Sequence, residues 1–398
     1  MIVIENISQI ATPEGRSGPL FGREMGKLRI YSGKNIWIEN GKIARITSER
    51  PDGRYERIDA ENGTVLPAFV DPHTHTVFSG YRDFELQLKL DGKSYSQILS
   101  SGGGIYHTVK MVRKSSRKEI FEESFKRIEN MAKHGTLSAE IKTGYGLDYE
   151  NERKILDVIE DISEKKIMDI KKTFLFHVIP QDVEYETFLS SMFRLLMERK
   201  QKIDFVDVFC DEGAFSVDQT RNIFSRAMEM GFGLKIHADE IKYIGCSLLA
   251  REFPLHSIDH LLNLPYENYR YLKNSIPVLL PGTSMTLMEN RYADARKMID
   301  SGLAVSLATD LNPNCYTENM QEIISLAIYN MKMKVEEAIT ASTHNAALAA
   351  GFSKKGSLEE GYDADIIILD VPSYTHLGYH FGINLVRKII KNGKELKI

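Results

Sequence analysis

Strand-like and helical segments alternate through the middle of the chain, and this alternation restricts the possible folds more than any other feature. Residues 137–142 have strand character and precede a helical pattern over 149–162, and residues 233–238 precede another over 245–252. Such alternation predicts a parallel sheet covered by helices, either a (β/α)8 barrel or a doubly wound sheet. No GxGxxG or GxxxxGKS/T motif follows a predicted strand, so we favour the barrel.

The two ends of the chain carry a different pattern. Residues 27–31 and 35–39 alternate between apolar and polar side chains, and residues 365–370 and 385–394 alternate again, with an Asn392-Gly393 pair that is typical of tight hairpins. At 398 residues the chain exceeds the size that one hydrophobic core usually serves. We therefore predict a composite β-sandwich domain from residues 1–63 and 350–398, and a (β/α)8 barrel over residues 64–349.

Histidines and an aspartate stand at the ends of predicted strands. His73 and His75 follow an apolar run, and their spacing of two places both imidazoles on one side of an extended chain. His237 ends a second apolar run and Asp310 ends a third, where an unpaired charge would be costly. In a barrel these strand ends form the catalytic face, and neutral imidazoles suit zinc or iron. The pattern predicts a metal site at the barrel mouth.

Three further residues occupy comparable positions. Glu240 follows His237 on the connecting loop, His260 follows a short strand-like run, and His177 ends another run just before Pro180. Plainer interpretations exist for single residues: Glu240 as a solvated carboxylate, His260 as a core histidine, and Asp310 as a helix N-cap. His177 could be a ligand, a substrate contact or a core residue. The joint occurrence of these residues at strand ends favours a catalytic centre.

Charge and cysteine content exclude several classes of protein. The net charge is -4 and the basic residues are scattered, so we expect no nucleic-acid partner. No eighteen apolar residues run together and the N-terminus lacks a basic and apolar leader, so we expect neither a membrane protein nor an exported one. Cys210, Cys246 and Cys315 are odd in number and show no CxxC spacing. Neither a disulfide framework nor a cysteine metal site is indicated, which favours a cytoplasmic location.

Longer runs resemble the amidohydrolase superfamily and, more narrowly, the imidazolonepropionase family of histidine degradation, over nearly the whole chain. The runs that carry this resemblance are residues 70–82, 142–147, 231–240, 279–283 and 307–313. The resemblance implies that one zinc or iron ion is bound by His73, His75, His237 and Asp310. It implies that Glu240 is the general base and acid and that His260 steadies the oxyanion or the water. It also implies a small-molecule substrate and a homodimer.

The resemblance further implies which residues hold the propionate and the ring of 4-imidazolone-5-propanoate: Arg82, Tyr95, Tyr145, His177 and Asn312. Arg82 lies on the loop after His75, where a guanidinium can bind a carboxylate through two hydrogen bonds, although an ion pair with Asp83 or Glu85 is the alternative. Tyr145 lies between two glycines that allow the loop to approach closely. A plain turn tyrosine is the competing interpretation.

The chain departs from the family pattern just after Asn312. Family members usually read Asn-Pro-Gly followed by Ser or Thr, whereas this chain has Asn314 and Cys315 there. Both are candidate pocket residues whose side-chain contacts, and any positive φ that glycine tolerates best, are open to question. An inert buried thiol is the favoured interpretation of Cys315 over an oxidation-sensitive one.

Two other functions compete with a ring-opening hydrolase. A cytosine-type or guanine-type deaminase would use the same ligands and the same glutamate, but a neutral base has no need of a cation such as Arg82. A noncatalytic barrel scaffold would need none of these residues, and here every expected ligand and Glu240 are present. We therefore expect a metal-dependent amidohydrolase.

Overall fold

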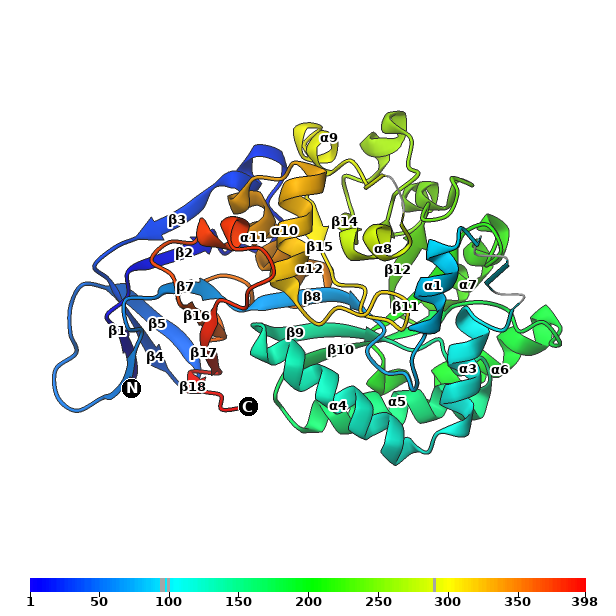
Figure 1. The fold of residues 1–398 in the computed structure, drawn as a ribbon, viewed down its shortest axis with the longest axis horizontal. Helices are drawn as coiled ribbons and strands as arrows, with labels where there is room; N and C mark the ends of the chain where they lie inside the picture. The colour runs from blue at the N-terminus through cyan, green and yellow to red at the C-terminus, as the bar shows by residue number, and fades with distance from the viewer. Residues whose placement is uncertain (94–96, 99–100, 289–290) are drawn as a thin grey trace.

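A parallel sheet of eight strands occupies the centre of the computed structural model (Figure 1), which describes residues 1–93, 97–98, 101–288 and 291–398. Its strands are β8 (Phe69–Thr74), β9 (Thr136–Lys142), β10 (Asp169–Phe176), β11 (Phe205–Cys210), β12 (Gly233–Ala238), β13 (Leu255–His260), β14 (Ile276–Leu279) and β15 (Ser306–Leu307). They follow one another in chain order from β8 to β15. Two backbone hydrogen bonds connect the end of the first strand, β8, to the segment that follows the last strand, β15. The N–H of Asp310 donates to the carbonyl of His73, and the N–H of His75 donates to that of Leu311. The (β/α)8 barrel prediction is confirmed.

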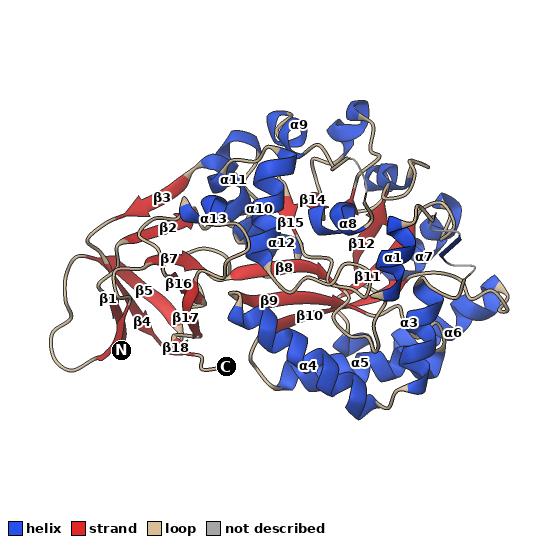
Figure 2. Cartoon of the chain, in the orientation of Figure 1, coloured by secondary structure: helices blue, strands red, loops and turns tan. Residues whose placement is uncertain are grey.

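Helices surround this sheet (Figure 2). They are α1 (Phe84–Leu90), α3 (Ile105–Lys114), α4 (Arg117–Lys133), α5 (Tyr149–Glu164), α6 (Tyr185–Glu198), α7 (Val217–Glu229), α8 (Pro281–Thr286), α9 (Ala295–Asp300), α10 (Met320–Met331), α11 (Val335–Ser342), α12 (His344–Ala349) and α13 (His376–Tyr379). The short 3-10 helices are η1 (Gly22–Gly26), η2 (Lys200–Lys202), η3 (Cys246–Arg251) and η4 (Tyr266–Tyr271). The helical pattern over 245–252 thus forms a 3-10 helix.

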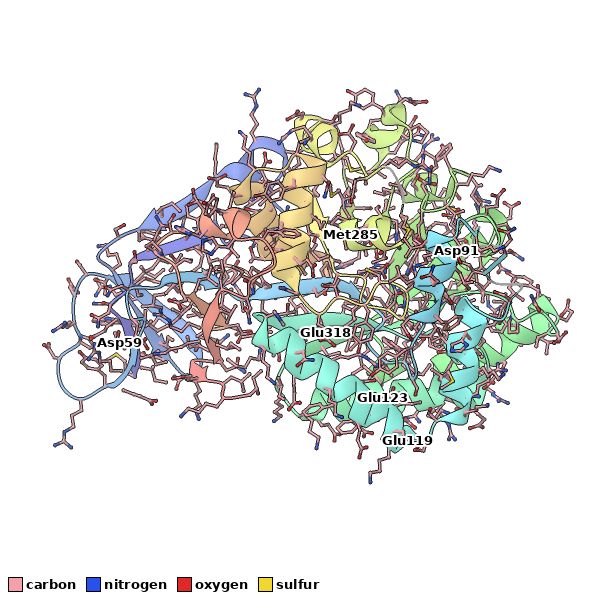
Figure 3. All side chains as sticks on the ribbon, viewed as in Figure 1. Asp59, Asp91, Glu119, Glu123, Met285 and Glu318 are labelled. Atoms are coloured by element: carbon pink, nitrogen blue, oxygen red, sulfur yellow. A yellow bond between two sulfur atoms is a disulfide. The ribbon has the colours of Figure 1, made fainter. Side chains whose placement is uncertain are left out.

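The amphipathic spacing of α5 shows how the helices attach to the barrel. Its buried residues Ile155, Ile159 and Ile162 recur every three or four positions and therefore share one face. They belong to the same core cluster as Ala139 and Ile141 of β9. On α4, which Figure 3 marks by Glu119 and Glu123, a capping box of Ser116 and Glu119 fixes the first turn.

Strands from both termini form two further sheets that lie side by side in Figure 1. The smaller sheet has the order β5 (Lys42–Thr47), β4 (Asn35–Glu39), β1 (Ile2–Glu5) and β6 (Glu56–Asp59). The larger has the order β18 (Lys394–Glu395), β17 (Val386–Lys391), β16 (Ile366–Leu369), β7 (Thr64–Pro67), β2 (Gln9–Pro13) and β3 (Leu28–Tyr31). Ile4 and Ile36 of the first sheet share a core with Val65 and Ile368 of the second, as in a sandwich.

The hairpin and domain predictions have different outcomes. Asn392 and Gly393 turn β17 into β18, and both have positive φ, as the two central residues of a type I′ turn require. β7, at residues 64–67, pairs with β16 and β2 in the larger terminal sheet. The division of the chain into domains at residues 63 and 350 stays a prediction. None of the helices in the described residues is long and apolar enough to cross a membrane.

The cysteine prediction was wrong. Cys210 at the end of β11 and Cys246 at the start of η3 form a disulfide with a Cα–Cα distance of 5.8 Å, across 36 residues of sequence. The two segments meet because β11 and β12 are neighbours in the barrel, which the cysteine spacing could not show. Cys315 is a free and buried cysteine, as expected.

Removing the disulfide should destabilise the fold. We expect Cys246→Ala to lower the free energy of unfolding by about 2–4 kcal/mol, because the unfolded chain gains freedom when the crosslink is lost. Urea denaturation of the variant and of the oxidised and reduced wild type measures this, with the free and buried Cys315→Ala as a control for lost packing. An oxidised wild type that is no more stable than the reduced protein would show that the crosslink contributes nothing.

Candidate active site

The carboxyl ends of the barrel strands open into a pocket of about 390 Å³. Most of the residues predicted for the site line it: His75, Arg82, Tyr145, His177, His237, Glu240, His260, Asp310, Asn312 and Asn314. His73 is fully buried next to them. Tyr95 lies outside the described residues. One face of the barrel thus gathers side chains from loops that are far apart in sequence.

Ligand-type atoms converge at the base of this pocket. His73 Nε2 and His75 Nε2 each lie 3.5 Å from Asp310 Oδ1, and His75 Nε2 lies 3.4 Å from His237 Nε2. Ligands of a tetrahedral ion with bonds of about 2.0–2.1 Å stand roughly 3.3 Å apart. Two overlapping groups could hold an ion: His73 with His75 and Asp310, and His73 with His237 and His260. The second group includes His260, which the sequence interpretation assigned a different role.

The imidazoles are held in the form that binds a metal. Buried Asp259 contacts Nδ1 of His73 at 2.5 Å, and buried Asp207 contacts Nδ1 of His237 at 3.1 Å. A proton on each Nδ1 leaves Nε2 with its lone pair, and Nε2 of His73 has no hydrogen-bond partner among the described residues. Burial, with neighbouring positive charge, holds the pKa of His73 and His75 well below the usual range. An unpartnered Nε2 on His73, beside the Nε2 atoms of His75 and His237, fits a divalent cation.

Glu240 and His260 face each other beside the ligand cluster. His260 Nε2 lies 3.6 Å from Glu240 Oε2, and the ring of His260 is 5.3 Å from that of His237. Burial lowers the pKa of His260 well below its usual value, so the ring is neutral. A carboxylate next to a ligand cluster and a neutral imidazole can accept and return a proton.

Backbone strain marks the same strand ends. Asp239, His260 and Asp310 all have positive φ, which is uncommon for residues other than glycine. Each is the last residue of a barrel strand or lies just beyond it. Such conformations cost roughly 1–3 kcal/mol each and concentrate at functional sites. Two of these residues, His260 and Asp310, line the pocket, so part of this conformational cost is borne at the site itself.

Comparison with known proteins decides the family. The model of the amidohydrolase family matches residues 64–396. The chain belongs to the amidohydrolase family. An imidazolonepropionase of Thermoplasma volcanium is 43% identical over 98% of this chain and 96% of its own length. One from Bacillus velezensis is also 43% identical, over 99% and 96%. Within the family, this amidohydrolase therefore belongs with the imidazolonepropionases.

Solved structures support the fold of this amidohydrolase. A triazine hydrolase variant has a TM-score of 0.80 with 13% identity, over 99% of this chain and 94% of that one. Guanine deaminase from C. acetobutylicum has a TM-score of 0.71 with 17% identity, over 99% of both chains. At these identities the likeness concerns the fold alone. The family and the His/Asp cluster together indicate a divalent metal.

Buried charged residues lie next to the His/Asp cluster of this amidohydrolase, and the sequence analysis did not predict them. The ammonium of Lys142 lies 2.7 Å from Asp207 and 2.9 Å from Glu140, and all three side chains are fully buried. Burial opposes the charge of Lys142, but these carboxylates and Asp259 raise its pKa above the ordinary value. Lys142 thereby balances the carboxylates that orient His73 and His237. The available signal was an ionisable residue inside an apolar strand, which must have a partner.

The loop that departs from the family pattern is held by Asn312. Its Oδ1 accepts the backbone N–H groups of Asn314 and Cys315 at 2.7 and 2.9 Å, which forms a local turn. Asn314 is not among the residues with positive φ, so this position makes no demand for glycine. The Cys315 thiol lies 3.5 Å from the carbonyl of Thr309, and burial raises its pKa to about 12. An inert thiol is therefore what the surroundings of Cys315 support.

Two of the three cationic side chains that line the pocket, Arg82 and Lys89, are in different electrostatic states. Arg82 forms a pair of 2.8 Å hydrogen bonds with Glu85, so much of its charge is neutralised within the protein. Lys89 donates to uncharged acceptors, the carbonyl of Thr286 at 3.0 Å and Oδ1 of Asn314 at 2.5 Å. Within the part of the chain that the structure describes, Lys89 forms no ion pair. Lys89 was not among the predicted site residues, because a lysine on a helix is usually a solvated one.

Proposed function

We propose that this amidohydrolase hydrolyses the ring amide of 4-imidazolone-5-propanoate to N-formimidoyl-L-glutamate in histidine degradation. The observation that carries the proposal is a single pocket that joins a His/Asp cluster and Glu240 to a cationic wall. Relatives at 43% identity over almost the full chain are named imidazolonepropionase. A cyclic amide that carries a propionate needs the cluster and Glu240 for hydrolysis of the amide, and the cationic wall for binding of the carboxylate.

We further propose that His73, His75, His237 and Asp310 hold one zinc or iron ion, since three imidazoles and a carboxylate suit both. A bound ion of this kind lowers the pKa of water toward 7 and polarises a carbonyl oxygen. Asp259 and Asp207 keep two of the imidazoles oriented through their Nδ1 atoms. The hydroxyl of Thr283 donates to Oδ2 of Asp310 at 2.5 Å and leaves Oδ1 facing the imidazoles.

Glu240 moves the protons of the reaction. The oxygen of a water adds to the ring carbonyl carbon, and Glu240 accepts the proton that the water gives up. The bond between this carbon and the ring nitrogen then breaks, and Glu240 returns the proton to the departing nitrogen. His260 stands within 3.6 Å of Glu240 and steadies the water or the oxyanion beside it.

Aromatic side chains form the wall for the ring. His177 stacks on His75 with ring centroids 5.6 Å apart, and Tyr145 lies 5.4 Å from the ring of His177. Nδ1 of His177 lies 3.1 Å from the carbonyl of Gly144, and burial lowers its pKa to about 3. These neutral surfaces suit a flat heterocycle, and Asn312, whose amide holds its own loop, lines the same pocket.

The propionate is bound by Arg82 and Lys89 together. Because Glu85 already balances Arg82, Lys89 is the cation that gains most from a substrate carboxylate. Asn314 holds the Lys89 ammonium at the pocket wall, which gives the unusual residue at this position a function. Burial lowers the pKa of Lys89, and an incoming carboxylate would raise it again.

Loss of the Lys89 charge should weaken substrate binding more than turnover. A hydrogen bond to a charged group is worth about 1.5–3 kcal/mol, so Lys89→Met should raise KM by roughly 10–150-fold with kcat largely kept. Lys89→Arg should raise KM less. Lys93→Met, at a more exposed lysine of the same pocket, is the matched control. Steady-state kinetics decide, and an unchanged KM in Lys89→Met would remove this residue from the carboxylate site.

The substrate is tested with the purified, metal-analysed protein. Fresh imidazolonepropionate is supplied and loss of the imidazolone chromophore is followed, with cytosine and guanine as comparison substrates. Turnover of imidazolonepropionate alone supports the proposal, whereas deamination of cytosine or guanine without it would reassign the enzyme to the deaminases. The cytoplasmic location, the homodimer and the absence of nucleic-acid and membrane partners stay predictions; size-exclusion chromatography with light scattering tests the dimer.

A further inference from the structure

A buried carboxylate holds the loop that carries Glu240. Asp211 directly follows β11, and its Oδ2 accepts the backbone N–H groups of Glu240 and Ile241 at 2.8 and 2.9 Å. Its Oδ1 accepts that of Lys242 at 3.0 Å. The Asp211 side chain belongs to a residue that is 2% exposed, so water does not compete for these bonds. Consecutive N–H groups that converge on an anion form a rigid loop conformation.

Other contacts hold the same loop from its remaining sides. The side-chain amide of Asn263 donates to the carbonyl of Glu240 at 2.7 Å, so both backbone polar groups of this residue are bound by side chains from neighbouring loops. Cys210, which precedes Asp211, is crosslinked to Cys246 at the far end of the loop. The end of β11 therefore determines where the Glu240 backbone lies.

A second buried carboxylate holds the loop of Tyr145 in the same way. Glu152, in the first turn of α5, accepts the backbone N–H groups of Gly144, Gly146 and Leu147 at 2.9, 2.7 and 2.9 Å. Glu152 is also 2% exposed. These groups flank Tyr145, whose ring contacts those of His75 and His177. One carboxylate thus serves the proton-transfer loop and the other serves the loop against the substrate ring.

We propose that Asp211 and Glu152 are positioning residues that control turnover and substrate binding separately. Asp211 sets the place of Glu240 relative to the reacting bond, so its loss acts on kcat. Glu152 sets the place of Tyr145 against the heterocycle, so its loss acts on KM. This inference rests on the proposed function, because it needs Glu240 to move protons and Tyr145 to contact substrate.

The two carboxylates provide matched controls for each other. Asn and Gln keep the shape of Asp211 and Glu152 but place an NH2 group or a weaker acceptor against the loop N–H groups. Displacement of a catalytic group by about 1 Å can cost 10²-fold, so Asp211→Asn should lower kcat by about 10–100-fold with KM within about twofold. Glu152→Gln should raise KM, and weaken calorimetric binding of N-formimidoyl-L-glutamate, by about tenfold with kcat largely kept. Metal content should equal that of the wild type in both variants.

Hydrogen exchange adds a measurement that needs no substrate. The amides of Glu240, Ile241 and Lys242 should lose protection in Asp211→Asn but keep it in Glu152→Gln, where those of Gly144, Gly146 and Leu147 lose it instead. If Asp211→Asn does not fold, Asp211→Ala, which leaves room for water at the carboxylate site, is measured in its place. Equal losses of kcat in both variants, or loss of protection with unchanged kinetics, would overturn the inference. Lack of wild-type turnover of imidazolonepropionate would instead reject the proposed function.

Discussion

Glu240→Gln should leave the metal site intact and lower kcat by about 10²–10⁴-fold, the usual contribution of a general acid and base. The glutamine amide fills the same space but cannot accept a proton from water. Glu240 is not one of the proposed ligands, and its backbone N–H and carbonyl remain bound by Asp211 and Asn263. The loss should therefore come from chemistry, with KM changed little.

A neighbouring carboxylate provides the control for this variant. Glu212 lies on the adjacent loop, is largely exposed and pairs with Lys242, so Glu212→Gln should keep wild-type kinetics. Metal analysis and steady-state kinetics with imidazolonepropionate are measured for both variants. A Glu240→Gln enzyme with full metal content and near wild-type kcat would assign the proton transfer to another group, such as His260.

The barrel and the mouth of the pocket could be predicted because both depend on local patterns. Alternating strand and helix signals specify a parallel sheet, and residues at the carboxyl ends of parallel strands must meet at one edge. This argument placed His73, His75, His237 and Asp310 at one barrel mouth together with His260, and the resemblance selected the first four as ligands. The structure brings the ligand atoms of these four to within 3.5 Å in successive pairs. Strand geometry also predicted that His73 and His75, two residues apart, point to the same side.

Contacts between strands could not be predicted, because the register between strands is not written in any local pattern. Lys142 lies within an apolar strand, but its partner Asp207 is on a strand two positions away in the sheet. For the same reason, the Cys210–Cys246 disulfide could not be predicted. Asp211 illustrates a further limit: a carboxylate after a strand is usually a turn residue, and only the fold shows which N–H groups it accepts.

Loss of the metal should abolish turnover and also destabilise the protein. Without a cation, the buried Nε2 of His73 has no hydrogen-bond partner among the described residues, and a buried unsatisfied polar group costs about 1–3 kcal/mol. Burial also raises the pKa of Asp310 to about 6, which shows how poorly this site tolerates an unbalanced carboxylate. A cation offsets both costs, and at a free concentration 100 times its Kd it adds about 2.7 kcal/mol of stability.

Chelation followed by thermal unfolding measures this second effect independently of any substrate. The chelated protein should lose activity and unfold at a lower Tm, and Zn²⁺ or Fe²⁺ should restore both. Asp259→Asn is the informative variant, because Asp259 orients His73 without being a proposed ligand, and loss of such a partner typically weakens metal affinity about 10–100-fold. An unchanged Tm and full turnover after verified metal removal would contradict the metal site, since the bound ion would then contribute neither to stability nor to catalysis.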